Sequence, residues 1–237
     1  LAADPIAKII EEDELITELT PSTVDDFISG GAPYKCTGVF FYSPVCPHCK
    51  SAWPEYYKTA RAFVRDRDNV TFGKVNCDMY RGICTRFSVT GYPTFLLFKN
   101  EPAKVKSFNN RNAEHLVEFV GSETGVFRQV NGHLNERAGR HWRLDLYAKD
   151  FMTRKDSRKH TRDDVNAVNW LYKDIYIRCM DKVEKLEATD PEAASAYPKK
   201  EVQRLSKIIE SDSGKVSEEK LDKLIIHKNI INSFVVA

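Results

Sequence analysis

Two cysteines separated by proline and histidine stand in the segment FYSPVCPHCK, residues 41–50. Such a pair binds a metal, forms a static disulfide, or cycles between dithiol and disulfide. Zinc sites usually take four ligands, from two such pairs or from histidines at defined spacing. Cys77 and Cys84 are separated by six residues rather than two, so the second ligand pair is missing and we expect no metal site.

The surroundings of the pair favour redox chemistry over a static disulfide. Cys46 follows a continuous apolar run at residues 38–43 and precedes a helix-like segment. Unpaired N–H groups and the helix dipole at a helix N-terminus stabilise a thiolate. Pro47 suits the first helical turn, where its missing N–H costs nothing. We therefore expect Cys46 to react first and Cys49, one turn later, to act second; protonated His48 would favour the thiolate and make the disulfide more oxidising.

The first half of the chain alternates strand-like and helix-like segments. The predicted strands are residues 14–19, 38–43, 70–76, 94–99 and 103–108. The predicted helices are residues 20–28, 47–66, 79–87 and 112–122. Interleaved helices imply a mixed sheet with a parallel core and helices on both faces.

The second half has a different pattern. Residues 121–132 contain glycines and read as a linker. Beyond them, apolar residues recur at three- and four-residue steps, which predicts helices at residues 133–152, 161–186, 198–211 and 217–234. We predict an N-terminal extension (1–13), an α/β domain (14–121), a linker (122–132) and an all-α helical bundle domain (133–237) with its own core.

Composition excludes some functions. The formal net charge of +2 gives no concentrated basic surface for nucleic acid. No apolar run approaches the roughly 20 residues of a membrane span. Six cysteines, four of them in two close pairs, suit an oxidising compartment. The end SFVVA lacks a K-D-E-L type retention signal, so retention would work differently or the chain is truncated.

The first domain resembles a known family. FYSPVCPHCKSAWPEYYKTA, with Pro54 in its helix, and the later GYPTFLLF are similar to the thioredoxin fold and, within it, to the protein disulfide isomerase family. The resemblance covers residues 14–121. It implies a cofactor-free thiol–disulfide oxidoreductase in which Cys46 and Cys49 are catalytic. It also implies a cis Tyr92–Pro93 bond whose loop faces Cys46 and holds the client chain extended.

Five positions refine that resemblance. Val45 stands where the family has tryptophan, which reduces one apolar client contact, and Pro47 gives a C-P-H-C sequence that resembles bacterial periplasmic dithiol oxidases. The family's buried acid falls at Phe40, so Lys74, which matches its usual partner, has no evident counter-charge. Arg111 matches the arginine that swings toward the second cysteine. Together these departures favour oxidation over reduction.

The other cysteines have structural interpretations. Cys77 and Cys84 resemble a second pair of some family members, which implies a structural disulfide worth about 2–3 kcal/mol; the alternative is two free thiols. Cys179 reads as a small apolar residue on a helix stripe.

The helical half is similar to the D domain of the D subfamily of disulfide isomerases and of a related redox-inactive escort protein of the endoplasmic reticulum. The resemblance implies the holding of polypeptide clients or partners. We therefore predict disulfide formation and isomerisation in secretory clients, in the endoplasmic reticulum lumen or secretory pathway, with a thiol oxidase or glutathione as redox partner. The alternative is an escort or chaperone in which redox chemistry is secondary.

Overall fold

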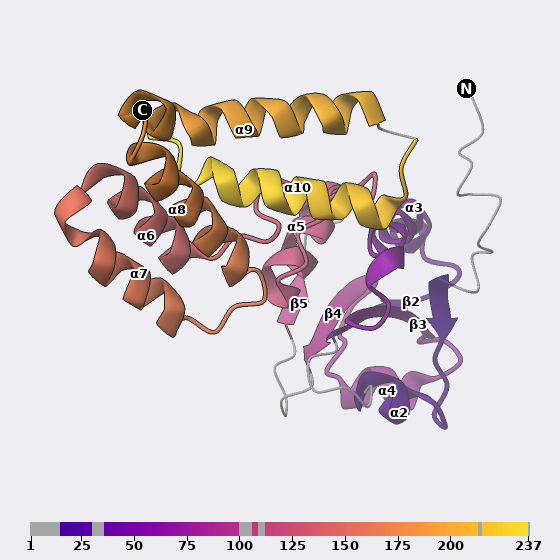
Figure 1. Ribbon diagram of the computed structural model, residues 1–237. Coiled ribbons are helices and arrows are strands. Elements are labelled where there is room, and N and C mark those ends of the chain that lie inside the picture. Colours follow the sequence, from indigo (N-terminus) through magenta and orange to yellow (C-terminus); the bar gives the residue numbers. More distant parts are fainter. Residues whose placement is uncertain (1–14, 30–35, 100–105, 109–111, 213–214, 237) are drawn as a thin grey trace. The chain divides into compact units, whose positions relative to one another are not determined.

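The computed structural model describes residues 15–29, 36–99, 106–108, 112–212 and 215–236 (Figure 1). The chain forms two compact units, Leu1–His133 and Leu134–Ala237. The first combines a sheet with helices and the second is helical. This agrees with the predicted fold class, an α/β domain followed by an all-α domain.

The first unit is built on a five-stranded sheet in the order β1-β3-β2-β4-β5. The strands are β1 (Ile16–Glu18), β2 (Cys36–Tyr42), β3 (Val70–Asn76), β4 (Thr94–Lys99) and β5 (Lys106–Phe108). β1 and β2 pair with β3 in parallel, whereas β4 runs antiparallel to β2 and β5. The sheet is therefore mixed with a parallel core, as the element order predicts.

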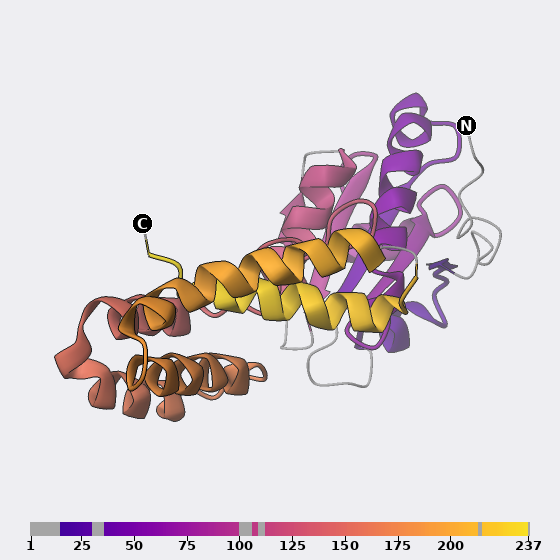
Figure 2. The same cartoon turned by 45° about the horizontal axis from the view of Figure 1, so that its top comes forward.

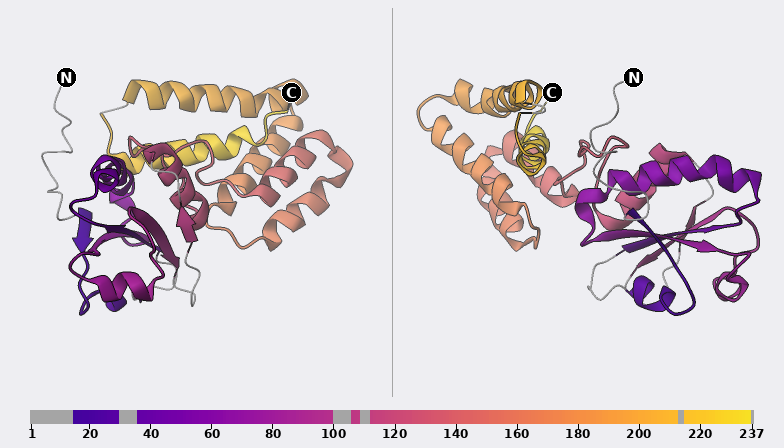
Figure 3. Two further views of the ribbon diagram at one scale, coloured as in Figure 1. Left: turned by 180° about the vertical axis from the view of Figure 1, so that it is seen from behind. Right: turned by 90° about the vertical axis from the view of Figure 1, so that its right-hand side faces the viewer.

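Helices cover both faces of this sheet (Figures 1 and 3). α3 (Pro47–Ala62) and α5 (Ala113–Thr124) lie on one face, and α2 (Val24–Ser29) and α4 (Arg81–Arg86) on the other. β2 is buried on both sides because successive residues point to opposite faces: Phe40 packs toward α3, and Phe41 packs in the cluster that contains Ile83 of α4. The C-terminal end of β2, where the cysteine pair begins, is thus held between two cores.

The segment predicted as a linker packs on the first unit. α5 continues to Thr124, and the buried Arg128 donates from Nε and Nη2 to the Asp66 carboxylate at 2.8 and 3.0 Å. Val126 and Val130 pack against the α3-side core. The domain limits at residues 121 and 133 stay a prediction, because contacts do not show which segments fold alone.

The second unit is a set of packed helices (Figure 2). They are α6 (Trp142–Thr153), α7 (Arg158–Ala167), α8 (Lys173–Glu187), α9 (Pro191–Asp212) and α10 (Glu218–Asn232). α9 and α10 run side by side (Figures 1 and 2). Their core contains fully buried side chains, among them Leu144, Phe151, Tyr176, Met180 and Phe234. Across the described ranges, no helix has the length and apolar character needed to cross a membrane.

The prediction of one continuous helix at residues 161–186 is wrong. The chain leaves the helix after Ala167 and re-enters it at Lys173. Trp170, in the intervening loop, donates from Nε1 to the Gly139 carbonyl at 3.0 Å, and Lys173 Nζ donates to the Asn166 carbonyl at 2.9 Å. In a continuous helix the Asn166 carbonyl would accept from the N–H of residue 170, whereas here it accepts from Lys173 Nζ.

Two predicted helix starts are also wrong. The helix expected from residue 133 begins at Trp142, because Gly139 adopts a φ of +79°, outside helical geometry. The helix expected behind Pro198 begins at Pro191 and contains Pro198 in its interior. Its first turn is capped by Asp190, whose Oδ1 accepts from the Ala193 N–H at 2.9 Å.

The Arg128–Asp66 pair generates a stability prediction. Changing Arg128 to Met leaves the Asp66 carboxylate without its bidentate partner, so we expect the free energy of unfolding to fall by about 3 kcal/mol. Urea unfolding followed by circular dichroism measures it. The control is Lys58→Met, which removes a partner of Glu55 that is 54% exposed and should cost under about 1 kcal/mol. Equal effects of the two changes would contradict docking of the 125–133 segment by Arg128.

Candidate active site

The first cysteine of the pair caps the N-terminus of α3. Cys46 has extended geometry (φ −72°, ψ 119°), and its carbonyl accepts from the N–H groups of Cys49 and Lys50 at 3.1 Å each. Its own N–H donates to the Ser43 carbonyl at 3.1 Å. Pro47 occupies the first helical turn, as expected. Cys46 therefore lies at the positive end of the α3 dipole, where an anionic sulfur is stabilised.

The two thiols of the pair differ in access. Cys46 is partly exposed, whereas Cys49 is 3% exposed and forms part of the buried interior. His48 and Pro47 lie exposed between them. An incoming sulfur therefore reaches Cys46 first, and Cys49 is placed to act from within the protein.

A loop at the same end of the sheet, before β4, faces Cys46. The Tyr92–Pro93 peptide bond is cis, in agreement with what the resemblance implies. Cys46 Sγ donates to the Tyr92 carbonyl oxygen at 3.8 Å. Thr94 Oγ1 donates to the Gly91 carbonyl at 2.7 Å and holds the loop at the start of β4. The loop thus presents main-chain groups beside the accessible sulfur.

Lys74 has a counter-charge that the sequence analysis did not find. In the sheet, Lys74 lies between Phe40 of β2 and Glu18 of β1. Its Nζ is 3.8 Å from Glu18 Oε2 and 4.9 Å from the centre of the Trp53 ring. The expectation that Lys74 has no evident partner is wrong, because the acid is supplied by the opposite neighbouring strand.

Aromatic side chains fill the position where the family has its acid. Phe40 packs against Trp53 and Tyr56, with ring centroids at 5.8 and 4.9 Å. Tyr42 donates from its hydroxyl to Glu18 Oε2 at 3.3 Å. Burial, and then the neighbouring Glu18 carboxylate, raise the pKa of Tyr42 to about 12, so this hydroxyl stays protonated at neutral pH. Glu18 therefore receives both an ammonium group and a hydroxyl donor.

The second cysteine pair fixes the loop that precedes Cys46. Cys77 and Cys84 are joined by a disulfide. Cys77 N–H donates to the Tyr42 carbonyl at 2.8 Å, and Ser43 Oγ donates to Asp78 Oδ2 at 2.7 Å. The loop after β3 is thereby tied to the loop after β2, three residues before the reactive thiol.

Two exposed apolar side chains lie on these tied loops. Val45 is 77% exposed and Met79 is 68% exposed. Sequence reasoning singled out Val45 but missed Met79, Ser43 and Asp78. The signal that could have revealed them is the parallel pairing of β2 with β3, which brings the ends of both strands to one edge of the sheet.

The remaining candidates stand apart from this site. Arg111 lies outside the described residues. Cys36 and Cys179 are buried, and burial raises the pKa of both thiols, so neither resembles a reactive cysteine. Among the described residues, no group of histidine, cysteine and acidic side chains has the arrangement of a metal site.

Comparison with known proteins follows the division of the chain. Residues 17–122 match the family model "Thioredoxin", and residues 139–234 match "Endoplasmic reticulum protein ERp29, C-terminal domain". The fourth thioredoxin domain of ERdj5 is similar in structure, with a TM-score of 0.41 and 27% identity, covering 46% of this chain and 95% of that one.

Curated relatives share both halves. A probable protein disulfide-isomerase A6 from Medicago sativa is 29% identical over 96% of this chain and 61% of its own length. Protein disulfide isomerase-like 2-2 from Oryza sativa subsp. japonica is 29% identical over 83% of this chain and 52% of its own length. The chain thus spans between half and two thirds of the length of these relatives. It combines one thioredoxin-type domain with an ERp29-type helical domain, and over both halves it is similar to proteins named disulfide isomerases.

Proposed function

We propose that the protein is a thiol–disulfide oxidoreductase that acts on polypeptides through Cys46 and Cys49. The observation that carries the proposal is the accessible Cys46 sulfur at the start of α3, beside the Tyr92 carbonyl, with the buried Cys49 one turn behind. A static disulfide needs neither the access nor the facing loop. The family relatives named as disulfide isomerases support it.

Oxidation of a client proceeds in two exchanges. A client thiolate attacks Sγ of Cys46 in the Cys46–Cys49 disulfide, a client–Cys46 mixed disulfide forms, and Cys49 leaves as a thiolate. A second client thiolate then attacks the client sulfur and releases Cys46. The client dithiol becomes a disulfide, and the protein pair, now reduced, requires a thiol oxidase or oxidised glutathione to restore it. In reduction or isomerisation, Cys46 attacks the client and Cys49 resolves the mixed disulfide.

A bias toward oxidation rests on the chemistry around the pair. Pro47 and His48 between the cysteines resemble the dithiol oxidases, and Phe40 puts an aromatic ring where the family has its acid. Lys74 supplies positive charge near Trp53, one helical turn beyond Cys49, which favours the thiolate over the disulfide. Val45 and the Tyr92–Pro93 loop are the proposed client contacts.

The relatives also support a location and a class of partners. The family model of the helical half is named for an endoplasmic reticulum protein, which supports the secretory pathway, and specifically the endoplasmic reticulum lumen, as the place of action. Clients are secretory polypeptides with thiols or disulfides. The Cys77–Cys84 bond supports an oxidising compartment.

A second function, escort of polypeptide clients, is favoured by the helical unit. Trp142 and Leu171 are 65% and 80% exposed there, and exposed apolar surface is a feature of protein interaction sites. In this case the helical unit captures clients and redox chemistry is secondary. A Cys46→Ser/Cys49→Ser variant that keeps full cellular function would favour escort over enzyme.

The central test is the refolding of a reduced client with several disulfides. Cys46→Ser should abolish the catalysed rate, because it removes the attacked sulfur. Cys49→Ala should retain attack by Cys46 but lose the resolving thiol, so mixed disulfides with the client should accumulate on non-reducing gels. The control is Cys179→Ala, which removes a buried thiol of the other unit and should leave the rate unchanged. Equal rates for wild type and Cys46→Ser would refute the proposal.

The oxidising bias is tested by the reduction potential in glutathione buffers. We expect a value at or above about −180 mV and a more reducing value in Pro47→Gly. Val45→Trp changes the surface beside the pair without changing the groups that act on the sulfur, so its potential should equal that of wild type. A wild-type potential near that of thioredoxin, about −270 mV, would overturn the bias.

The role of Lys74 is tested by the rate at which Cys49 resolves a mixed disulfide. Lys74→Met removes a positive charge that favours the Cys49 thiolate, so the midpoint of the pH–rate profile for resolution should move to higher pH. At pH 7 the rate should then fall by roughly tenfold for each pH unit of that shift. Glu18→Gln should shift the midpoint in the opposite direction, because Lys74 loses its counter-charge. The control is Lys99→Met, since Lys99 pairs with Glu123 elsewhere on the sheet. An unchanged pH profile in Lys74→Met would exclude the role.

A further inference from the structure

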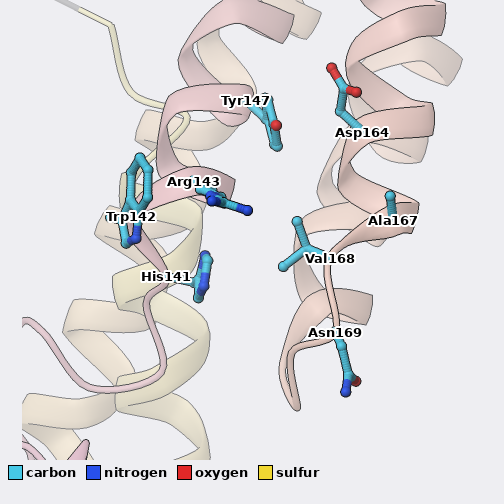
Figure 4. Close-up of a pocket in the computed structure, with 8 residues that line it drawn as sticks. All are labelled: His141, Trp142, Arg143, Tyr147, Asp164, Ala167, Val168 and Asn169. Carbon is cyan, nitrogen blue, oxygen red and sulfur yellow. The ribbon is translucent and has the colours of Figure 1, made fainter.

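The helical unit contains a cleft that the redox chemistry does not use. It has a volume of about 490 Å³ and lies between the start of α6 and the C-terminal end of α7 (Figure 4). His141, Trp142 and Arg143 form one wall, and Tyr147 lies across from Asp164. The opposite wall is formed by Asp164, Ala167, Val168 and Asn169. Its size is within the range of about 300–1,000 Å³ that ligand pockets span.

The α6 wall is held by a buried polar network. The His141 N–H donates to the Tyr176 hydroxyl at 3.2 Å, and that hydroxyl donates to Asp145 Oδ1 at 2.7 Å. Arg140 Nε donates to the other carboxylate oxygen of Asp145 at 3.0 Å. Because Tyr176 is fully buried, these bonds fix the backbone from which the cleft residues project. The cleft is therefore preformed rather than shaped by loose side chains.

The α7 wall is anchored independently. Trp170, directly after Asn169, donates from Nε1 to the Gly139 carbonyl at 3.0 Å, and its ring lies 5.2 Å from that of His141. The Trp170–Gly139 hydrogen bond therefore ties the two walls to each other.

Arg143 differs from its neighbouring arginines. Arg140, Arg158 and Arg162 each pair with a carboxylate of the same unit. In the part of the chain that the structure describes, the one contact of the Arg143 guanidinium is the Trp142 ring, at 5.2 Å from the ring centre. Figure 4 shows the Arg143 side chain extending into the gap toward the opposite wall. A guanidinium stacked on an aromatic face keeps its planar donors available for a carboxylate.

We propose that this cleft binds an extended polypeptide segment in which a carboxylate side chain lies between aromatic residues. The carboxylate pairs with Arg143, and an aromatic side chain packs on the Trp142 face, which is 65% exposed. The Asp164 carboxylate and the Asn169 amide on the opposite wall accept hydrogen bonds from main-chain N–H groups of the segment.

This inference names the client chemistry of the proposed escort role but does not depend on the cysteine pair. The test uses the full chain with Cys46→Ser and Cys49→Ser, so that no mixed disulfide contributes. The probe is a fluorescein-labelled decapeptide with Phe-Asp-Phe at its centre and Gly and Ser elsewhere, and the readout is fluorescence anisotropy. We expect saturable binding that weakens about tenfold or more when the central Asp becomes Asn.

Variants of the protein locate the binding. Arg143→Ala and Trp142→Ala should each weaken Phe-Asp-Phe binding about tenfold, from the lost charge-assisted hydrogen bonds and the lost apolar contact. The matched controls on α6 are Leu146→Ala and Arg154→Ala, an exposed apolar and an exposed basic residue outside the cleft. The affinity of these two variants for the Phe-Asp-Phe peptide should stay within about twofold of the parent, because surface changes away from a contact cost little.

A charge exchange gives the sharpest outcome. Arg143→Glu should lose Phe-Asp-Phe binding and gain binding to the matching Phe-Lys-Phe peptide. Unchanged affinity in Arg143→Glu, or equal loss in the Leu146→Ala and Arg154→Ala controls, would overturn the proposal. Because the cysteines are absent in every arm, these results are independent of those that decide the redox function.

Discussion

The hydroxyl of Tyr56 determines where the redox helix lies on the sheet. This side chain is 1% exposed, and its oxygen donates to the carbonyls of Gly38 and Gly73 at 3.1 and 2.7 Å. A buried hydroxyl without partners costs free energy comparable to a lost hydrogen bond, so α3 has one favourable register on the strands. Gly38 is needed beneath it, since a Cβ there would lie 2.9 Å from the Phe72 ring. At 1.5 Å per helical residue, this contact fixes the thiol of Cys46 from about 15 Å away.

From this fixed helix, the site is completed by three chain segments that end at one edge of the sheet. β2 delivers Ser43 and the cysteines, β3 delivers Asp78, and the turn before β4 delivers the Tyr92 carbonyl. The reacting sulfurs themselves lie at the start of α3. The ends of β2 and β3 and the turn before β4 surround them, and the strand order brings these segments together.

Elements whose structure depends on neighbouring residues could be predicted from the sequence. The strands, α3 and its proline positions were predicted from motifs and periodicity, and the facing loop was implied by the family resemblance. The sequence was insufficient wherever a contact joins distant residues. Glu18 meets Lys74 across two strands that are 56 positions apart, and Arg128 meets Asp66 across 62 positions. The break between α7 and α8 also depends on a long-range contact. The apolar residues keep helical spacing through this region, but the hydrogen bond from Trp170 to the Gly139 carbonyl holds the segment in a loop.

The group that stands next to the reactive sulfur is a main-chain carbonyl, not a side chain. Every polypeptide carries the complementary N–H at nearly every residue, so this contact discriminates little between one amino-acid sequence and another. Selection among cysteines then falls to their availability: a segment must be unfolded enough to lie extended beside α3. Under the proposed function, this contact favours disulfide exchange with client segments that are still unfolded over exchange with folded ones.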